Sequence, residues 1–505
     1  MKRSSIVICI FVFAKFLLQL AALFQPEYGI FRDELYYLAC TKHLAWGFVD
    51  HPPFSIVLLW AWASIAGDSL VSLRILAALI GTLPIVLAGL ITRQLGGEWK
   101  AQALACFAVL LAPVQLSVGS FYSMNVIEYA LILVLVWLLL RIIIEQQSSF
   151  WILFGVLLGV GIMNKHTFAV LAGFLLIGLL FTPARKEFLK KYFWIGMGTA
   201  FLIVLPNLIW QFSHNLISLE FYKNASELKN VPTPPIKIVL DQLLASNPIA
   251  GILWVTGLVW LLRGKERSEY RIFGIAFLLM LAMMITAQSN RLDRIALFIP
   301  VLVAGGAVVW ERWNAKRFLR WLILATSVLL LIVGLVSMPM VLPVMSPSST
   351  AQYLQQHGMQ PNFEKGVSAK LPQNLADRFG WKELADSVAS VIQRLPERER
   401  NSVILAGQNY GDAGALEYYG RSLNFPKVIS GHNSYWLWGA GEQAEVLIIV
   451  GNSRSRMEEL FNDVQEGTRA STGWQMNYEC NRPIWICRKP KLPLAEIWPK
   501  AKMFI

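Results

Sequence analysis

Long apolar runs separated by short polar segments dominate the first two thirds of the chain. A helix needs about twenty apolar residues to cross the hydrocarbon core of a bilayer. Runs of about this length occur near 5–24, 69–92, 101–120, 124–144, 193–210, 249–263, 270–287, 295–311 and 319–341. The pattern therefore predicts a polytopic α-helical membrane protein.

The stretch Trp151–Phe181 is long enough for one tilted helix or for two short ones, and the polar turn Asn164–Thr167 interrupts it. Arg141 precedes it, and four basic residues follow it: Arg185, Lys186, Lys190 and Lys191. Because basic loops stay on the cytoplasmic side, the chain is expected to cross twice here, with the polar turn facing outward. The total becomes about eleven spans, with the N-terminus inside and the C-terminal segment outside.

The first run follows Lys2 and Arg3 and reaches about Phe24 without a small-residue cleavage site, so it is interpreted as an uncleaved span. Lys15 lies inside this run. A charge there is costly and marks a functional candidate, although a partner in the bundle or a side chain reaching to the interface explains it more simply.

Two segments between spans are predicted to be external loops of a transmembrane catalytic domain over 1–342. They are 25–68 and 211–248, the second with Val231-Pro-Thr-Pro-Pro235 in it. Within the first, Phe54–Gly67 is apolar but short, and it carries Trp60 and Trp62, which is typical of an interfacial helix.

From residue 343 to 505 the composition becomes that of a soluble domain. Val403–Ala406 and Val446–Val450 have the pattern of buried strands, and Trp381–Leu395 and Met457–Val464 have helical patterns, so a small α/β domain is expected. Cys480 and Cys487 lie in this domain, either bridged or as two free thiols.

Composition supports the membrane assignment. Of the 505 residues, 55% are hydrophobic and only 15% are charged, and the mean hydropathy is +0.50. The net charge of +13 lies mainly in short clusters between the apolar runs. We therefore attribute it to membrane orientation and to anionic lipids as partners, and not to nucleic acid.

Polar side chains concentrate directly after the first span, on the expected outer side. Phe31-Arg-Asp-Glu-Leu-Tyr-Tyr37 is followed by Trp46-Gly-Phe-Val-Asp-His-Pro-Pro53. A charged loop at the headgroup level can be merely solvated, so spacing alone does not establish a function for it.

In its motifs the sequence resembles glycosyltransferase family 39, the protein O-mannosyltransferases, lipid A aminoarabinose transferases and their bacterial relatives. The similar features are Asp33-Glu34 after the first span, the run 46–53, the interfacial helix, the turn 164–167, and the segments 409–420 and 430–439. The resemblance implies a GT-C fold and an external active site that takes a sugar from polyprenyl phosphate and inverts the anomeric centre.

The resemblance also implies roles for individual residues. Asp33 corresponds to the general base, and Glu34 would position the acceptor or Asp33, unless it only faces the macrodipole of its helix. Cations at the outer face would stabilise the leaving phosphate. The candidates are Lys165, with His166 beside it in the turn, Arg32, His51, Arg291 and Arg294.

Several alternatives stay open. His51 with Asp50 could hold a metal, although phosphate contact is preferred and no cofactor or obligatory metal is expected. Tyr36 and Tyr37 could stack on the sugar or the isoprenoid, or belong to an interfacial aromatic belt. In the outer domain Asn409, Asp412, His432 and Asn433 could bind the acceptor, and for Asn409 and Asp412 capping and turn formation are equally simple.

The sequence thus predicts a multi-pass enzyme of the bacterial inner membrane. It would move one sugar from a polyprenyl-phosphate donor to a periplasmic lipid, glycan or protein. The rival hypothesis from another class is a transporter or flippase of polyprenyl-linked sugars, which would show pseudo-symmetric halves. No such halves are evident in the sequence.

Overall fold

The computed structural model describes residues 2–229, 232–264, 268–288, 298–313, 317–359, 368–441 and 445–505. The chain divides into two compact units, each built from separate stretches. The helical unit comprises Met1–Phe24, Val71–Trp210 and Val231–Val344, and the α/β unit comprises Gln25–Leu70, Gln211–Asn230 and Met345–Ile505.

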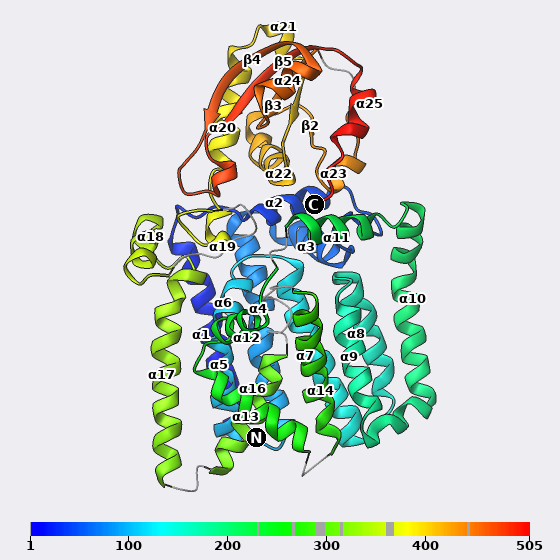
Figure 1. The fold of residues 1–505 in the computed structure, drawn as a ribbon, viewed down its shortest axis with the longest axis vertical. Coiled ribbons are helices and arrows are strands. Elements are labelled where there is room, and N and C mark those ends of the chain that lie inside the picture. Colours follow the sequence, from blue (N-terminus) through cyan, green and yellow to red (C-terminus); the bar gives the residue numbers. More distant parts are fainter. Residues whose placement is uncertain are drawn as a thin grey trace. The chain divides into compact units, whose positions relative to one another are not determined.

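The helical unit is built from helices of very different lengths (Figure 1). They are α1 (Lys2–Ala21), α4 (Leu70–Gln94), α5 (Trp99–Leu110), α6 (Pro113–Val118), α7 (Met124–Glu145), α8 (Phe150–Asn164), α9 (Phe168–Leu180), α10 (Lys191–Ser213), α12 (Pro235–Ala245), α13 (Ala250–Arg263), α14 (Arg271–Thr286), α16 (Ile299–Trp313) and α17 (Arg317–Val341).

In the part of the chain that the structure describes, six helices are long and apolar enough to cross a membrane, or up to eight if each bent helix pair counts as one span. The chain is therefore a multi-pass membrane protein. The total of eleven spans stays a prediction.

The stretch from Trp151 to Phe181 forms two short helices, α8 and α9, as the charge pattern indicated. The expected span 101–120 is instead broken into α5 and α6. Pro113 begins α6, and the residue before a proline is driven out of the helical region; Ala112 has an extended ψ of 119°. The segment 211–248, whose external position stays a prediction, contains helix α12, which is bent by 111° from α13.

Helices α13 and α16 pack closely through glycines. A Cβ on Gly257 would lie 1.8 Å from the backbone oxygen of Leu302, and a Cβ on Gly306 would lie 2.0 Å from that of Leu253. Small residues let helix backbones approach in this way inside a membrane, where packing rather than apolar burial holds helices together.

Replacing Gly257 with valine is therefore expected to force these helices apart and to cost about 1–3 kcal/mol of stability. The measurement is the thermal unfolding midpoint of the detergent-solubilised protein. Gly198→Ala in α10 is the control, because a Cβ there meets open space. Equal midpoints for the two variants would contradict the expectation.

The α/β unit contains a five-stranded sheet in the order β2-β1-β3-β5-β4 (Figure 1). β1 pairs in parallel with β2 and β3, and β5 is antiparallel to β3 and β4. The strands are β1 (Val403–Ala406), β2 (Val428–Ile429), β3 (Val446–Val450), β4 (Phe461–Ala470) and β5 (Arg482–Pro490).

The helices of this unit come from all three of its stretches. They are α2 (Arg32–Cys40), α3 (Phe54–Ala66), α11 (Ile217–Leu228), α18 (Pro347–Gln356), α19 (Gln373–Ala376), α20 (Trp381–Arg394), α21 (Glu397–Arg400), α22 (Tyr410–Tyr419), α23 (Ser434–Leu437), α24 (Arg454–Leu460) and α25 (Leu494–Ile497). The expected interfacial helix 54–67 is thus a helix, α3.

Both faces of the sheet are covered, because side chains alternate along each strand. In β1, Val403 and Leu405 join a core with α20 and α22, whereas Ile404 and Ala406 face the cluster that includes α24 and α25. The strands expected at 403–406 and 446–450 and the helix expected at 381–395 are confirmed.

The helix expected over Met457–Val464 is wrong in its second half. α24 ends at Leu460, and Phe461 begins β4, where it pairs with Pro490 of β5. The long pairing with β5 replaces the last helical turn, and Phe461 is buried against the sheet. Cys480 and Cys487 are both free thiols, with Cys487 buried in β5.

Candidate active site

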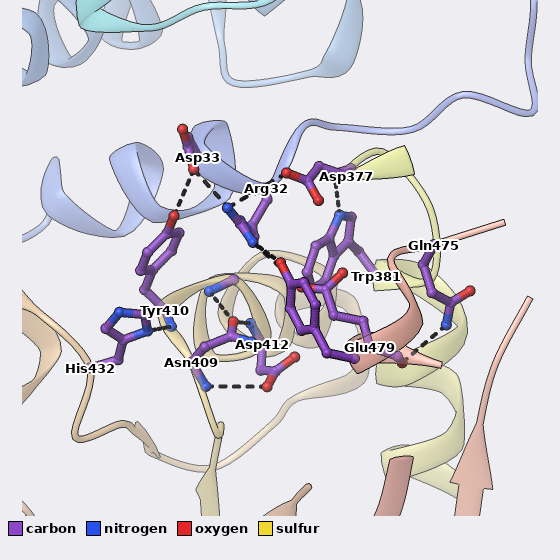
Figure 2. A network of polar contacts seen from close by, with 12 residues as sticks. Arg32, Asp33, Asp377, Trp381, Asn409, Tyr410, Asp412, His432, Gln475 and Glu479 are labelled. Carbon is purple, nitrogen blue, oxygen red and sulfur yellow. Dashed lines mark hydrogen bonds and ion pairs between the residues drawn. The ribbon is translucent and has the colours of Figure 1, made fainter. Parts of the chain in front are cut away.

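Helix α2 carries the acidic pair that follows the first span. Glu34 is buried, and its carboxylate accepts a hydrogen bond from the Phe31 backbone N–H at 2.8 Å, so it caps the helix that it belongs to. Asp33 points elsewhere, as expected for neighbours about 100° apart around a helix. Its side chain is 35% exposed and accepts a hydrogen bond from the Tyr410 hydroxyl at 2.9 Å (Figure 2).

Arg32 is enclosed by groups of its own unit. Its guanidinium lies 3.8 Å from Asp33, 3.6 Å from Asp377 and 3.8 Å from Glu479, donates to the Tyr478 hydroxyl, and lies over the Tyr410 ring. Burial lowers the pKa of this group, but Asp377 and the other negative groups outweigh burial, so the pKa stays well above its ordinary value. These contacts indicate that Arg32 holds α2 against the 377 and 478–479 segments of the same unit.

Tyr36 links α2 to the loop that carries Asp50. Its hydroxyl donates to Asp50 Oδ1 at 2.8 Å and accepts the backbone N–H of Ser434 at 3.2 Å. Burial raises the pKa of Tyr36 well above its usual value, so the hydroxyl stays protonated as a donor. The Tyr36 ring lies 4.8 Å from that of Tyr410, so it packs inside the unit.

His51 is fully buried beside the same loop. Its Nδ1 lies 3.0 Å from the Pro52 carbonyl, its ring packs edge-on against Tyr37 at 4.9 Å, and its Nε2 lies 4.0 Å from Asp50 Oδ1. Because a carbonyl only accepts, Nδ1 carries the hydrogen. Among the residues described, no group of three His, Cys, Asp or Glu side chains is placed to hold a metal ion.

The start of α22 supports Tyr410 and thereby Asp33. The Asn409 side chain caps the helix by accepting the backbone N–H groups of Gly411 and Asp412 at 2.8 and 3.0 Å. Asp412 is buried and binds Arg482 through both oxygens, at 2.7 and 2.6 Å. Asn409 thus caps the helix, the alternative to acceptor binding that the sequence left open, whereas Asp412 forms an ion pair that the sequence did not indicate.

His432 holds the backbone of Tyr410. Its Nδ1 accepts the Tyr410 backbone N–H at 3.3 Å, and its Nε2 lies 2.7 Å from the Ile505 backbone oxygen. Burial lowers the pKa of His432 to about 3, so the ring is neutral at physiological pH. The Asn433 side chain accepts the Ile505 backbone N–H at 3.1 Å. His432 therefore ties Ile505 to the start of α22, and Asn433 holds the same residue.

Glu479 is buried beside Arg32 and Asp377, and burial, reinforced by the charge of Asp377, raises its pKa to about 8. The folded protein keeps a proton that the unfolded chain releases above about pH 4.5, so the free energy of unfolding falls as pH rises toward 8. His432 makes the free energy of unfolding rise with pH, but only between its lowered pKa of about 3 and its ordinary pKa of 6.5.

Between pH 6.5 and 8, wild-type stability is therefore expected to fall by up to about 1.4 kcal/mol per pH unit. Glu479→Gln, which cannot ionise, should flatten this slope. Thermal unfolding across this pH window measures both proteins. An equally steep decline in the variant would contradict the assignment.

The second candidate region lies in the helical unit, at the turn between α8 and α9. Lys165 Nζ contacts Glu128 Oε2 at 2.7 Å and Asn125 Oδ1 at 2.9 Å, both on α7. Thr167 donates to the other oxygen of Glu128 at 3.3 Å. His166 Nε2 lies 3.0 Å from Asn207 Oδ1 on α10. The turn is thus fixed between two long helices.

Glu128 and Asn125 were not among the sequence-based candidates. Glu128 was detectable in principle, because it is the only acidic residue in the apolar run 124–144, and an ionisable residue inside a span is a functional candidate by default. Arg291 and Arg294, two of the expected phosphate ligands, lie outside the described residues.

Comparison with known proteins gives a family match for part of the chain and a fold match for nearly all of it. Residues 50–210 match the family described as dolichyl-phosphate-mannose-protein mannosyltransferase. The lipopolysaccharide core galacturonosyltransferase RgtB of Rhizobium johnstonii is 25% identical over 207 residues, 39% of this chain and 40% of that protein. This alignment therefore spans about two fifths of the relative's length.

Two solved structures match nearly the whole chain. ArnT from Cupriavidus metallidurans in the apo state aligns with a TM-score of 0.64 at 14% identity, covering 95% of this chain and 97% of that one. The same protein bound to undecaprenyl phosphate aligns with a TM-score of 0.62 at the same identity and coverage. Residues 50–210 are thus similar to the dolichyl-phosphate-mannose-protein mannosyltransferase family, and the chain has the fold of the ArnT structures.

Proposed function

We propose that this protein is a GT-C glycosyltransferase that moves a sugar from a polyprenyl-phosphate carrier to a lipid, glycan or protein outside the cytoplasmic membrane of a bacterium. In this proposal the chain crosses the membrane about eleven times, with the N-terminus cytoplasmic and the α/β unit periplasmic. Support comes from the family match over 50–210 and from the shared fold with a structure bound to undecaprenyl phosphate.

The observation that carries the proposal is the setting of Asp33. It is a partly exposed carboxylate on a capped helix, held by the Tyr410 hydroxyl at 2.9 Å. The hydrogen bond fixes the orientation of the carboxylate, and its partial exposure leaves it accessible. Such a group is suited to accept a proton from an acceptor hydroxyl.

The reaction is a single displacement. Asp33 takes the acceptor proton while the acceptor oxygen forms a bond to the anomeric carbon of the sugar. The bond from that carbon to the phosphate oxygen breaks, and its electron pair leaves with the phosphate. Inversion follows because attack and departure occur on opposite sides of the carbon.

Lys165 supplies positive charge for the leaving phosphate in this mechanism. Its ion pair with Glu128 fixes where the ammonium lies, and Asn125 and Thr167 hold the pair in place. Preorganised charge stabilises a transition state without reorganisation during the reaction. Asp50 and His51 lie in the same unit as Asp33 and are the next candidates for substrate contact.

The test uses purified protein in liposomes with an undecaprenyl-phosphate-linked sugar and a mixture of envelope lipid, glycan and protein acceptors. Release of free undecaprenyl phosphate, dependent on the acceptor, supports the proposal. Appearance of the intact donor in the opposite leaflet without release would identify a flippase and overturn it.

A further inference from the structure

The α/β unit contains a cavity of about 390 Å³ that the proposed reaction does not use. It lies at the carboxyl ends of the three parallel strands. Gly407 and Gln408 line it directly after β1, Ser430 and Gly431 after β2, and Asn452 after β3. Its volume is within the range of small-molecule sites in proteins.

The connections that follow β1 and β3 leave the sheet on opposite faces. After β1 the chain enters α22, whose Leu416 packs with α20, and after β3 it enters α24, whose Met457 packs on the other face. Neighbouring parallel strands that diverge in this way open a crevice at their carboxyl ends, where open α/β sheets bind ligands.

The backbone around the crevice is shaped for close approach. Gly451, directly after β3, has a φ of +75°, and a Cβ there would lie 1.9 Å from Gln408 Oε1. A glycine is therefore required for the Gln408 amide to lie across the strand end. Gln408 and Asn452 both line the cavity, so each brings a side-chain amide to the site.

The charges around the cavity have one sign. Arg456, Lys500 and Lys502 line it, and none of the lining residues within 368–441 and 445–505 is acidic. Arg456 and Lys502 have carboxylate partners outside the lining, Glu459 at 2.6 Å and Glu220 at 2.8 Å. The rest of the wall combines the polar side chains of Gln408, Ser430 and Asn452 with apolar ones, among them the rings of Phe461 and Trp498.

We propose that this cavity binds a saccharide that carries an anionic group, either a carboxylate or a phosphate. The basic side chains match the anion, and the amides of Gln408 and Asn452 both donate and accept, as sugar hydroxyls require. Trp498 offers a flat apolar ring face, and its indole N–H donates to the Trp436 carbonyl at 3.0 Å. An acyl chain would leave the amides without partners.

This site is separate from the Asp33 cluster, because none of Asp33, Tyr36, Asp50 and Tyr410 lines the cavity. The inference therefore goes beyond the proposed transferase reaction and does not depend on it. Gly407 and Tyr410 lie only three residues apart, so the segment between them forms part of both regions.

The test is isothermal titration calorimetry on the full-length protein in detergent, without lipid donor. Four probes are compared: glucose 6-phosphate, glucuronate, glucose and inorganic phosphate. At least tenfold tighter binding of one or both anionic sugars than of glucose and phosphate supports the proposal, and the tighter of the two identifies the anion.

Lys500→Glu should weaken binding of the anionic sugar at least tenfold, because it reverses a charge in the lining. Lys382→Glu is the matched control, since Lys382 is an exposed lysine on α20, which covers the other face of the sheet. The proposal is overturned if neither anionic sugar binds or if inorganic phosphate binds as tightly as the anionic sugars. It is also overturned if Lys500→Glu and Lys382→Glu bind the anionic sugar with equal affinity. None of these outcomes bears on turnover of the lipid donor.

Discussion

Asp33→Asn is expected to slow release of undecaprenyl phosphate by about 10²–10⁴-fold, the range typical of removing a general base. Asparagine keeps the size and the hydrogen bond from the Tyr410 hydroxyl but cannot accept the proton. Binding of the donor should persist, so the loss should appear in the turnover number. The measurement is initial rate against donor concentration in the reconstituted system.

Asp68→Asn is the matched control. Asp68 lies in the same unit and has nearly the same exposure, 34% against 35%, but it pairs with Arg421. Its replacement should leave turnover unchanged. Wild-type turnover in Asp33→Asn, or an equal loss in both variants, would remove Asp33 from the mechanism. Tyr410→Phe should cause a smaller loss, because it removes only the hydrogen bond that holds the base.

Breaking the pair between Lys165 and Glu128 is expected to destabilise the helical unit by about 3–5 kcal/mol, because either single replacement leaves a buried charge without its partner. The ammonium and the carboxylate lie 2.7 Å apart, with side chains 9% and 1% exposed. Lys165→Met and Glu128→Gln should each lower the thermal unfolding midpoint. The double variant Lys165→Met/Glu128→Leu should recover most of it.

Helix α7 provides its own control. Arg141 and Glu145 form an ion pair at 2.7 Å with side chains 29% and 35% exposed, and Arg141→Met should cost no more than about 1 kcal/mol. If replacing Lys165 and replacing Arg141 lowered the unfolding free energy by similar amounts, the Lys165 pair would not behave as a buried ion pair. If Lys165 serves the leaving phosphate, the double variant should be stable yet slow, which separates catalysis from folding.

The local parts of the fold were predictable. The strands Val403–Ala406 and Val446–Val450 are short apolar runs buried on both faces, and the charges flanking Trp151–Phe181 correctly divided that stretch into α8 and α9. The boundary between α24 and β4 was not predictable, because Phe461 at that boundary pairs with Pro490 of β5, 29 residues further along the chain.

The contacts around Asp33 could not be predicted from local sequence patterns for the same reason. Tyr410 is 377 residues from Asp33 along the chain, and the contacts of Arg32 with Asp377 and Glu479 are similarly distant. No spacing rule joins such positions. The motif containing Asp33 was visible, whereas its partners required the folded α/β unit.

The α/β unit is built from three separate stretches of the chain, so it can be completed only after the last of them has been synthesised. Its first stretch, Gln25–Leu70, leaves the ribosome long before its last, Met345–Ile505. At about 5–20 residues per second, helix α2 waits roughly 20–75 s for Tyr410 to be made. Throughout that interval Arg32 lacks Asp377 and Glu479, so a nascent chain truncated before residue 377 should be degraded rather than stored.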